Sequence, residues 1–159
     1  MNKIEKDIDR LNALHKLKLQ GDQLNPELEK IVQEAADICK SPISLINLVD
    51  RDNTFFMAKV GTTLTGSPRE ISFCSHAIEG SSIMEAADAM TDERFNKNPL
   101  VTGDPNIKFY AGAPLITKHG YNIGTLCVFD TKAKKLDDTQ LEALDMLSRK
   151  VIIILESNL

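Results

Sequence analysis

The sequence has no tryptophan, few aromatic residues and no long hydrophobic run. Aromatic residues make up 5% of the 159 residues, so any ligand site must be built largely from aliphatic and polar groups. The longest strongly apolar run, Val151 to Leu155, falls far short of the roughly 20 residues that a membrane-spanning helix requires. The first ten residues mix both signs of charge, which does not match a secretory signal. We therefore expect a cytoplasmic protein with no membrane partner.

Cysteine is also scarce, and neither sign of charge dominates. Cys39, Cys74 and Cys127 are an odd number without paired spacing, which is typical of reduced thiols rather than of a disulfide framework. Zinc sites usually contain closely spaced ligand pairs, which these three cysteines do not form, so we predict no metal site. The 23 acidic and 19 basic residues are spread along the chain and give a net charge of -4. Because there is no basic stripe, we predict no nucleic-acid partner.

The overall composition is that of a globular domain, and the sequence predicts three main helices. With 42% apolar and 26% charged residues, the chain is close to an average soluble protein. Apolar residues recur at steps of three and four within 1–20, which predicts an N-terminal amphipathic helix. Asn25 is a preferred helix cap and precedes a proline, so a second helix is predicted to begin there. A third is predicted over 137–157, where Asp137 and Gln140 match a capping box.

Two β-hairpins are predicted between these helices. Residues 43–49 and 54–60 are rich in β-branched and alternating apolar residues and flank a polar turn. Residues 107–116 and 121–129 flank a second turn, and their nearly continuous apolar character predicts central strands covered on both faces. Residues 82–86 read as a weaker strand. Hairpins with flanking helices predict an α+β fold with an antiparallel sheet.

The segments that join the hairpins are less regular. Residues 61–68 are predicted to be a polar loop. Residues 71–78 have the apolar spacing of a short helix, but Ser67 to Glu70 also match a capping box, so both starting points stay open. The long stretch 87–108 is predicted to be a loop held down by its own apolar residues.

Five motifs in this order resemble the GAF domain family. They are PREISFCSHAI at 68–78, DERF at 92–95, NPLVTG at 98–103, FYAGAPL at 109–115 and GTLCVFD at 124–130. The resemblance runs from Leu11 to Leu155 and is strongest to GAF domains found ahead of histidine kinases and diguanylate cyclases. It implies a single domain over 1–159, with an antiparallel sheet of about six strands. It also implies helices on one face of the sheet and a loop-covered pocket on the other.

The same resemblance implies a sensory or regulatory module that binds a small molecule, without naming the ligand or any cofactor. We expect the loop 87–108 to close over the pocket. The alternative is a packed connecting loop without a ligand, in which Cys74 is a small core residue and His76 a hydrogen-bonded histidine. The candidate ligand-binding residues are Phe73, Cys74, His76, Asp88, Phe109 and Tyr110.

Two other functions stay open beside this one. Free methionine-R-sulfoxide reductase is an enzyme that resembles the GAF family and uses several cysteines. The residues around the three cysteines of this chain do not match its motifs, and we assign no catalytic residue. The second alternative is a ligand-free dimerisation module.

Apolar stripes on the terminal helices predict a homodimer. These stripes, within 1–20 and 137–157, are wider than one contact face needs. We expect Ile4, Ile8 and Leu11 to contact the partner, together with Ile152 and Leu155. No output domain is recognisable in the sequence. The effector, such as a histidine kinase or a diguanylate cyclase, is therefore expected either as a separate protein or in a longer chain.

Overall fold

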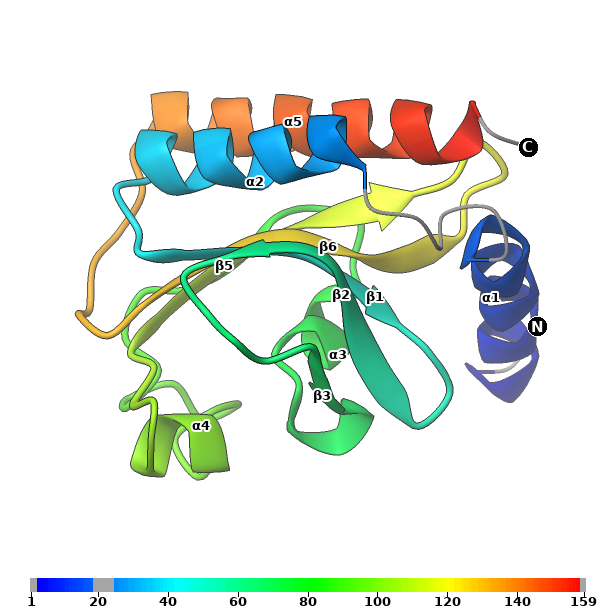
Figure 1. Ribbon diagram of the computed structural model, residues 1–159. Coiled ribbons are helices and arrows are strands. Elements are labelled where there is room, and N and C mark those ends of the chain that lie inside the picture. Colours follow the sequence, from blue (N-terminus) through cyan, green and yellow to red (C-terminus); the bar gives the residue numbers. More distant parts are fainter. Residues whose placement is uncertain (1–2, 19–24, 158–159) are drawn as a thin grey trace.

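The computed structural model describes residues 3–18 and 25–157, which contain one six-stranded sheet (Figure 1). The strand order is β3-β2-β1-β6-β5-β4, and all neighbouring strands are antiparallel. The predicted α+β class and the six-stranded antiparallel sheet are confirmed. The strands are β1 (Ile43–Val49), β2 (Asn53–Val60), β3 (Gly66–Pro68), β4 (Met84–Ala86), β5 (Phe109–Ile116) and β6 (Asn122–Asp130).

The helices form layers on both sides of this sheet. In Figure 1, α2 and α5 lie side by side along one face, α3 and α4 lie below the other face, and α1 stands at the side. A short 3-10 helix, η1, directly precedes the segment that leads into α3. The bounds are α1 (Lys3–Lys18), α2 (Pro26–Ile38), η1 (Arg69–Ile71), α3 (Cys74–Ala77), α4 (Pro99–Thr102) and α5 (Asp138–Glu156).

The two long helices begin where their capping residues predict. The Asn25 side chain accepts hydrogen bonds from the backbone of Glu27 and Leu28 at 2.9 and 3.3 Å. Asp137 accepts from the backbone of Gln140 at 2.8 Å, and the Gln140 side chain accepts from the backbone of Asp137 at 2.9 Å. Each cap satisfies donors that the first turn of a helix leaves unpaired.

The sheet separates two cores, because successive residues of a strand point to opposite faces. On β1, Ile46 and Leu48 join the first core, which is formed with α2 and α5. Leu45 and Val49 of the same strand join the second core, on the side of α3. Residues of β5 and β6 divide in the same way, since Ala111 and Val128 join the first core and Tyr110 and Cys127 join the second. The cover predicted on both faces of these central strands is therefore confirmed.

Two local predictions differ from the structure. The predicted loop 61–68 ends in the edge strand β3, whose three residues pair with β2. The predicted helix over 71–78 is instead η1 followed by the single turn of α3, because Ser72 between them adopts an extended backbone conformation. The helix predicted within 1–20 is α1, and the remaining residues of that range lie outside the described residues.

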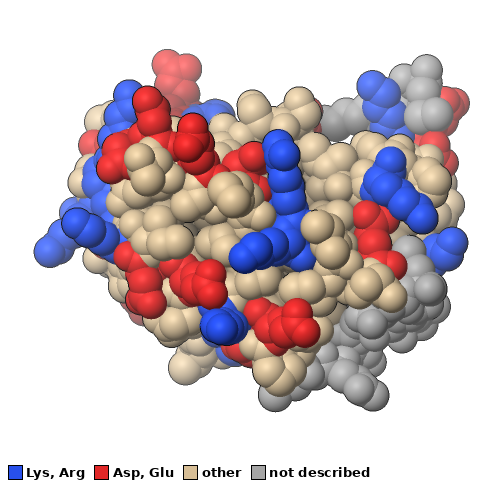
Figure 2. Space-filling model, turned by 90° about the horizontal axis from the view of Figure 1, so that it is seen from above, with Lys and Arg blue, Asp and Glu red and all other residues tan. Residues whose placement is uncertain are grey.

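The two residues of the last helix that were predicted to contact a partner are not exposed. Ile152 and Leu155 are buried in the first core, whereas Met146 and Ile153 of the same helix are exposed. Figure 2, which views the molecule from the side of α2 and α5, shows acidic and basic side chains interspersed on this face. Among the described helices, none is long and apolar enough to cross a membrane.

Candidate functional site

The second core has a polar centre built around the sulfur of Cys74. This atom lies 2.9 Å from Thr125 Oγ1, 3.3 Å from Tyr110 Oη and 3.2 Å from Asn47 Nδ2, which donates to it. The sulfur of Cys127 lies 3.9 Å away. All five residues are buried, none with more than 3% of its surface exposed. We refer to these five residues as the thiol cluster.

Three strands and one helix bring the thiol cluster together. Asn47 on β1 and Thr125 on β6 are direct partners in the antiparallel register, so both side chains can meet on the same face. The Tyr110 ring extends along β5 over Gly112, where an added Cβ would overlap the tyrosine hydroxyl. Cys74 is the first residue of α3, which packs against β1, β5 and β6. Glycine at position 112 therefore creates the space in which the tyrosine hydroxyl reaches the sulfur.

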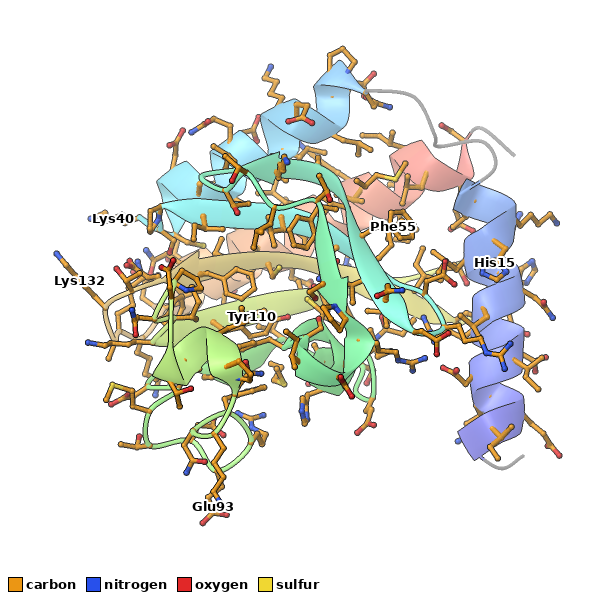
Figure 3. The ribbon with its side chains drawn as sticks, turned by 60° about the horizontal axis from the view of Figure 1, so that its bottom comes forward. His15, Lys40, Phe55, Glu93, Tyr110 and Lys132 are labelled. Carbon is orange, nitrogen blue, oxygen red and sulfur yellow. The ribbon has the colours of Figure 1, made fainter. Side chains whose placement is uncertain are left out.

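Aromatic rings surround this polar centre. Phe73 stacks on Phe95 with ring centroids 4.2 Å apart and an interplanar angle of 8°. Tyr110 lies 5.2 Å from Phe73 and 5.0 Å from Phe129, centroid to centroid. Figure 3 shows Tyr110 at the centre of the molecule, whereas Glu93 extends outward from the loop between β4 and β5. The rings place the cluster in a medium of low polarity, where its hydrogen bonds are strengthened.

The two thiols of the cluster have different acidities. Burial raises the pKa of Cys127 well above that of an ordinary cysteine, and its proximity to Cys74 acts in the same direction. Burial also acts to raise the pKa of Cys74, but hydrogen bonds from Cys127, Thr125 and Tyr110 together lower it to about 6. The pKa of Tyr110 is raised by burial and by the two neighbouring sulfurs, so its hydroxyl stays protonated. The cluster thus favours a thiolate at Cys74.

One polar atom of the cluster has no partner. Asn47 Oδ1 is buried and makes no hydrogen bond to any part of the chain that the structure describes. A buried polar atom left unpaired costs about 1–3 kcal/mol. The cluster is therefore not optimised for stability, and a bound hydrogen-bond donor would remove this cost.

The structure brings together three of the six residues predicted to bind a ligand. Phe73, Cys74 and Tyr110 meet in the second core. His76 is exposed at its rim, with its ring centroid 5.1 Å from that of Phe95 and the two rings nearly perpendicular. The other two residues stand apart.

Asp88 and Phe109 do not join this group. Asp88 is half-buried, and its carboxylate accepts from the backbone N–H of Met90 in the turn after β4. Phe109 lies in the first core, on the opposite face of the sheet from Tyr110, because adjacent strand residues point in opposite directions. The structure therefore places Phe109 outside the predicted pocket.

Three members of the thiol cluster were missed from the sequence as site residues. They are Asn47, Thr125 and Cys127. A usable signal was present, because Asn47 and Thr125 are polar residues inside otherwise apolar strands. A polar side chain in a buried strand needs a partner, so such residues indicate a polar site in a core.

A separate groove of about 970 Å³ lies beside α1. Asp7 is one of its lining residues and accepts from Arg10 Nε at 3.0 Å and from Arg69 Nη2 at 2.9 Å. The hydrogen bond from Arg69 lowers the pKa of Asp7 against the opposing effect of burial, and Arg10 adds to the lowering. Figure 3 shows His15 on α1, far from Tyr110. The ion pair between Asp7 and Arg69 joins α1 to the domain. The groove is distinct from the thiol cluster.

No metal centre accompanies either site in the described ranges 3–18 and 25–157. Within them, no three His, Cys, Asp or Glu side chains are grouped closely enough to hold a metal ion.

Comparison with known proteins identifies relatives of most of the chain. A family model described as GAF domain matches residues 23–155, a range that begins after α1. A cyclic di-GMP phosphodiesterase of Pseudomonas aeruginosa is 41% identical over 125 residues, which are 78% of this chain and 21% of that protein. The chain thus spans about a fifth of the length of this relative.

Solved structures share the fold at low sequence identity. The type II free methionine-R-sulfoxide reductase from Thermoplasma acidophilum superposes with a TM-score of 0.70 and 13% identity, covering 87% of this chain and 96% of that one. The GAF domain of an Acinetobacter phosphoenolpyruvate-protein phosphotransferase gives a TM-score of 0.70 at 17% identity, covering 99% of this chain and 95% of that one. At these identities the similarity concerns the fold, since one fold carries many functions.

Proposed function

Because the chain belongs to the GAF domain family, we propose that it is a non-catalytic sensory module that binds a small molecule beside the thiol cluster. The observation that carries this proposal is the polar centre of the second core, with Asn47 Oδ1 buried and unpartnered among the described residues. An apolar core at this position would avoid the desolvation cost of that atom. The ligand we propose therefore carries at least one hydrogen-bond donor and fits among aromatic rings.

Binding at this place requires the cover of the cluster to move. The cover consists of α3 and the loop 87–108, which Phe95, Val101 and Ile107 anchor in the second core. All three anchors are buried, so the ligand has to bind a state in which they are displaced. A ligand that prefers the displaced state increases its population by its difference in affinity for the two states. This change in the population of the displaced state is the signal that the module would transmit to a partner.

The central strands offer a route from the ligand to the helices. On β1 and β6, residues of the thiol cluster alternate with residues of the first core that contact α2 and α5. Since one relative is a cyclic di-GMP phosphodiesterase, we propose that the output partner is an enzyme of cyclic di-GMP turnover, a diguanylate cyclase included. A histidine kinase is the other effector compatible with this family. We place the module in the cytoplasm, where its three free cysteines stay reduced.

Amide NMR with a pool of polar metabolites tests the proposed ligand site. A bound compound is expected to shift the signals of Cys74, Tyr110 and Thr125. Tyr110→Phe removes the hydroxyl from the cluster but keeps the ring, so it should weaken binding. Tyr121→Phe is the matched control, because this half-buried tyrosine lies next to the β5–β6 turn and outside the cluster. Shifts confined to α1 and α5 would contradict the proposed site.

We propose further that the module is a homodimer through α5. Met146 and Ile153 are 63% and 67% exposed, and they lie seven residues apart on the same helix face. Ile4 and Ile8 on α1 are exposed as well. Ile153→Glu should convert a dimer into a monomer in sedimentation at tens of micromolar, whereas Glu142→Gln on α5 should not. A wild-type chain that is strictly monomeric under these conditions would rule the dimer out.

One enzymatic alternative is favoured by the pair of neighbouring thiols. A free methionine-R-sulfoxide reductase would consume thiol equivalents when it is given free methionine sulfoxide, and Cys74→Ser would abolish the turnover. The proposed sensory function predicts no turnover by either protein. If neither turnover nor any metabolite-dependent NMR shift is found, the chain is a ligand-free dimerisation module.

A further inference from the structure

We propose that Cys74 and Cys127 are a hydroperoxide-sensitive thiol pair that closes reversibly into a disulfide. The pair joins two distant parts of the sequence, the start of α3 and the middle of β6. Their sulfur atoms are 3.9 Å apart in the reduced protein, and a disulfide of about 2.0 Å requires a further approach of about 2 Å. Neither ligand binding nor dimerisation requires a change in the thiols, so the disulfide is a separate property of the protein.

The surroundings assign a different role to each sulfur. The amide of Asn47 donates to the sulfur of Cys74, and the hydroxyls of Tyr110 and Thr125 lie 3.3 and 2.9 Å from it, where they can donate to a thiolate. The sulfur of Cys127 lies 3.7 Å from a backbone carbonyl oxygen, that of Leu45, and such an acceptor favours the protonated thiol. A thiol that faces an acceptor keeps its proton, whereas a sulfur that faces donors loses it. Cys74 is therefore the attacking sulfur and Cys127 the resolving thiol.

The reaction with hydrogen peroxide balances in two steps. First, the Cys74 thiolate attacks one peroxide oxygen, so that an S–O bond forms and the O–O bond breaks. The hydroxide that leaves takes up the proton that Cys74 released on ionising and becomes water. The sulfenic acid at Cys74 is then attacked by the sulfur of Cys127. The S–S bond forms as the S–O bond breaks, and the departing hydroxide takes the Cys127 proton to become the second water. Two thiols are oxidised by one peroxide, which supplies the only oxidant.

Both sulfurs are fully buried, so the peroxide must enter through a local opening. The cover is suited to such an opening because α3 is a single turn of four residues. The helix η1, which precedes α3, is joined to the loop 87–108 by a hydrogen bond of 2.8 Å from the Asn98 side chain to the backbone oxygen of Ile71. A disulfide would fasten the start of α3 directly to β6. Oxidation is thus expected to lock the cover over the second core.

Cys39 provides an internal control. It is also buried, but it lies in the first core on the other side of the sheet. Burial raises the pKa of Cys39 to about 11, so its thiol stays protonated. We expect it to be unreactive toward peroxide in the folded protein.

The test is intact-mass spectrometry of the full chain after graded hydrogen peroxide, with a peptide map under non-reducing conditions. The expected result is a loss of about 2 Da, a Cys74–Cys127 linked peptide, and recovery of both thiols with dithiothreitol. Cys39→Ser should behave like the wild type. Cys127→Ser cannot form the bond, so its Cys74 should gain one oxygen and be trapped by dimedone.

The wild-type peptide map alone decides whether the disulfide forms, even if a variant is unstable. A bond through Cys39, a bond between two chains, or oxidation that needs urea would overturn the proposal. So would dimedone on Cys39 rather than Cys74 in Cys127→Ser. Because the readout is a covalent mass, it is independent of the ligand titration, and either proposal can fail alone.

Discussion

Phe95→Ala offers the sharpest test of how the second core is held together. Phe95 is fully buried although it lies in a loop, and its ring stacks on Phe73 at 4.2 Å between centroids. Removing a buried phenylalanine side chain costs about 3–5 kcal/mol, through lost transfer free energy and the cavity left behind. Of this, the aromatic stack itself contributes about 0.5–1.5 kcal/mol. The loss is expected near the upper end of the range if the stacked neighbour cannot fill the space.

Urea unfolding followed by far-ultraviolet circular dichroism measures this loss, since the chain has no tryptophan to report by fluorescence. With a slope of about 2 kcal/mol per molar urea, a loss of about 4 kcal/mol lowers the midpoint by about 2 M. Phe55→Ala is the matched control, because this phenylalanine on β2 is half-buried and packs against the first core. It should cost less than Phe95→Ala.

The cavity itself can be probed with benzene. An apolar cavity of the size of a phenyl ring stays dry and binds small aromatic molecules. Benzene should therefore raise the urea midpoint of Phe95→Ala by mass action and leave the wild type unchanged. If Phe95→Ala loses no more free energy than Phe55→Ala, the loop 87–108 is not anchored by this ring. In that case the loop is not held closed over the second core.

Two further perturbations test the packing around α1 and in the sheet. The hydrogen bond from Arg69 lowers the pKa of Asp7, so the stabilisation from this ion pair is present at neutral pH and is lost as the pH falls below 3.8 toward the lowered value. Asp7→Asn should therefore lower the free energy of unfolding by about 1–2 kcal/mol in thermal unfolding at pH 7, and by progressively less in acid. The control is Asp145→Asn, which removes an exposed ion pair and should cost under about 0.5 kcal/mol. Gly124→Ala should prevent folding or cost several times as much as Gly120→Ala, because its Cβ would overlap a backbone oxygen of β1. At Gly120, where φ is +90° and the space is open, alanine should lower the free energy of unfolding by about 1–3 kcal/mol in urea unfolding. Equal losses for Gly124→Ala and Gly120→Ala would show that the close approach of β1 to Gly124 is not what requires glycine there.

Elements with strong local signals were predictable from the sequence. Asp137 and Gln140 form the expected capping box, since a cap depends on residues three positions apart and on little else. The hairpins were also found, because apolar runs separated by turn residues need no distant information. The edge strand β3 was missed because its three residues, Gly-Ser-Pro, lack the alternation that marks a strand. It exists because β2 offers it a pairing partner.

The candidate site was predictable only in part. The nearly continuous apolar run of β5 indicates burial on both faces but does not say which residues face which core. Strand alternation alone separates Phe109 from Tyr110, so these neighbours could not both line one pocket. The meeting of Cys74 with Cys127 could not be derived in this way. It depends on how the segment between β3 and β4 crosses the sheet, which no local pattern encodes.

That crossing has a consequence for movement, which follows from its length. Strands β3 and β4 are the two opposite edges of the sheet, so the segment 69–83 spans its full width of about 24 Å for five strand spacings. Fully extended, these residues could reach about 50 Å, roughly twice that distance. The excess length is coiled into η1 and α3. The segment that carries α3 is therefore longer than its crossing of the sheet requires. We expect that this part of the cover can move away from the sheet without unpairing either edge strand.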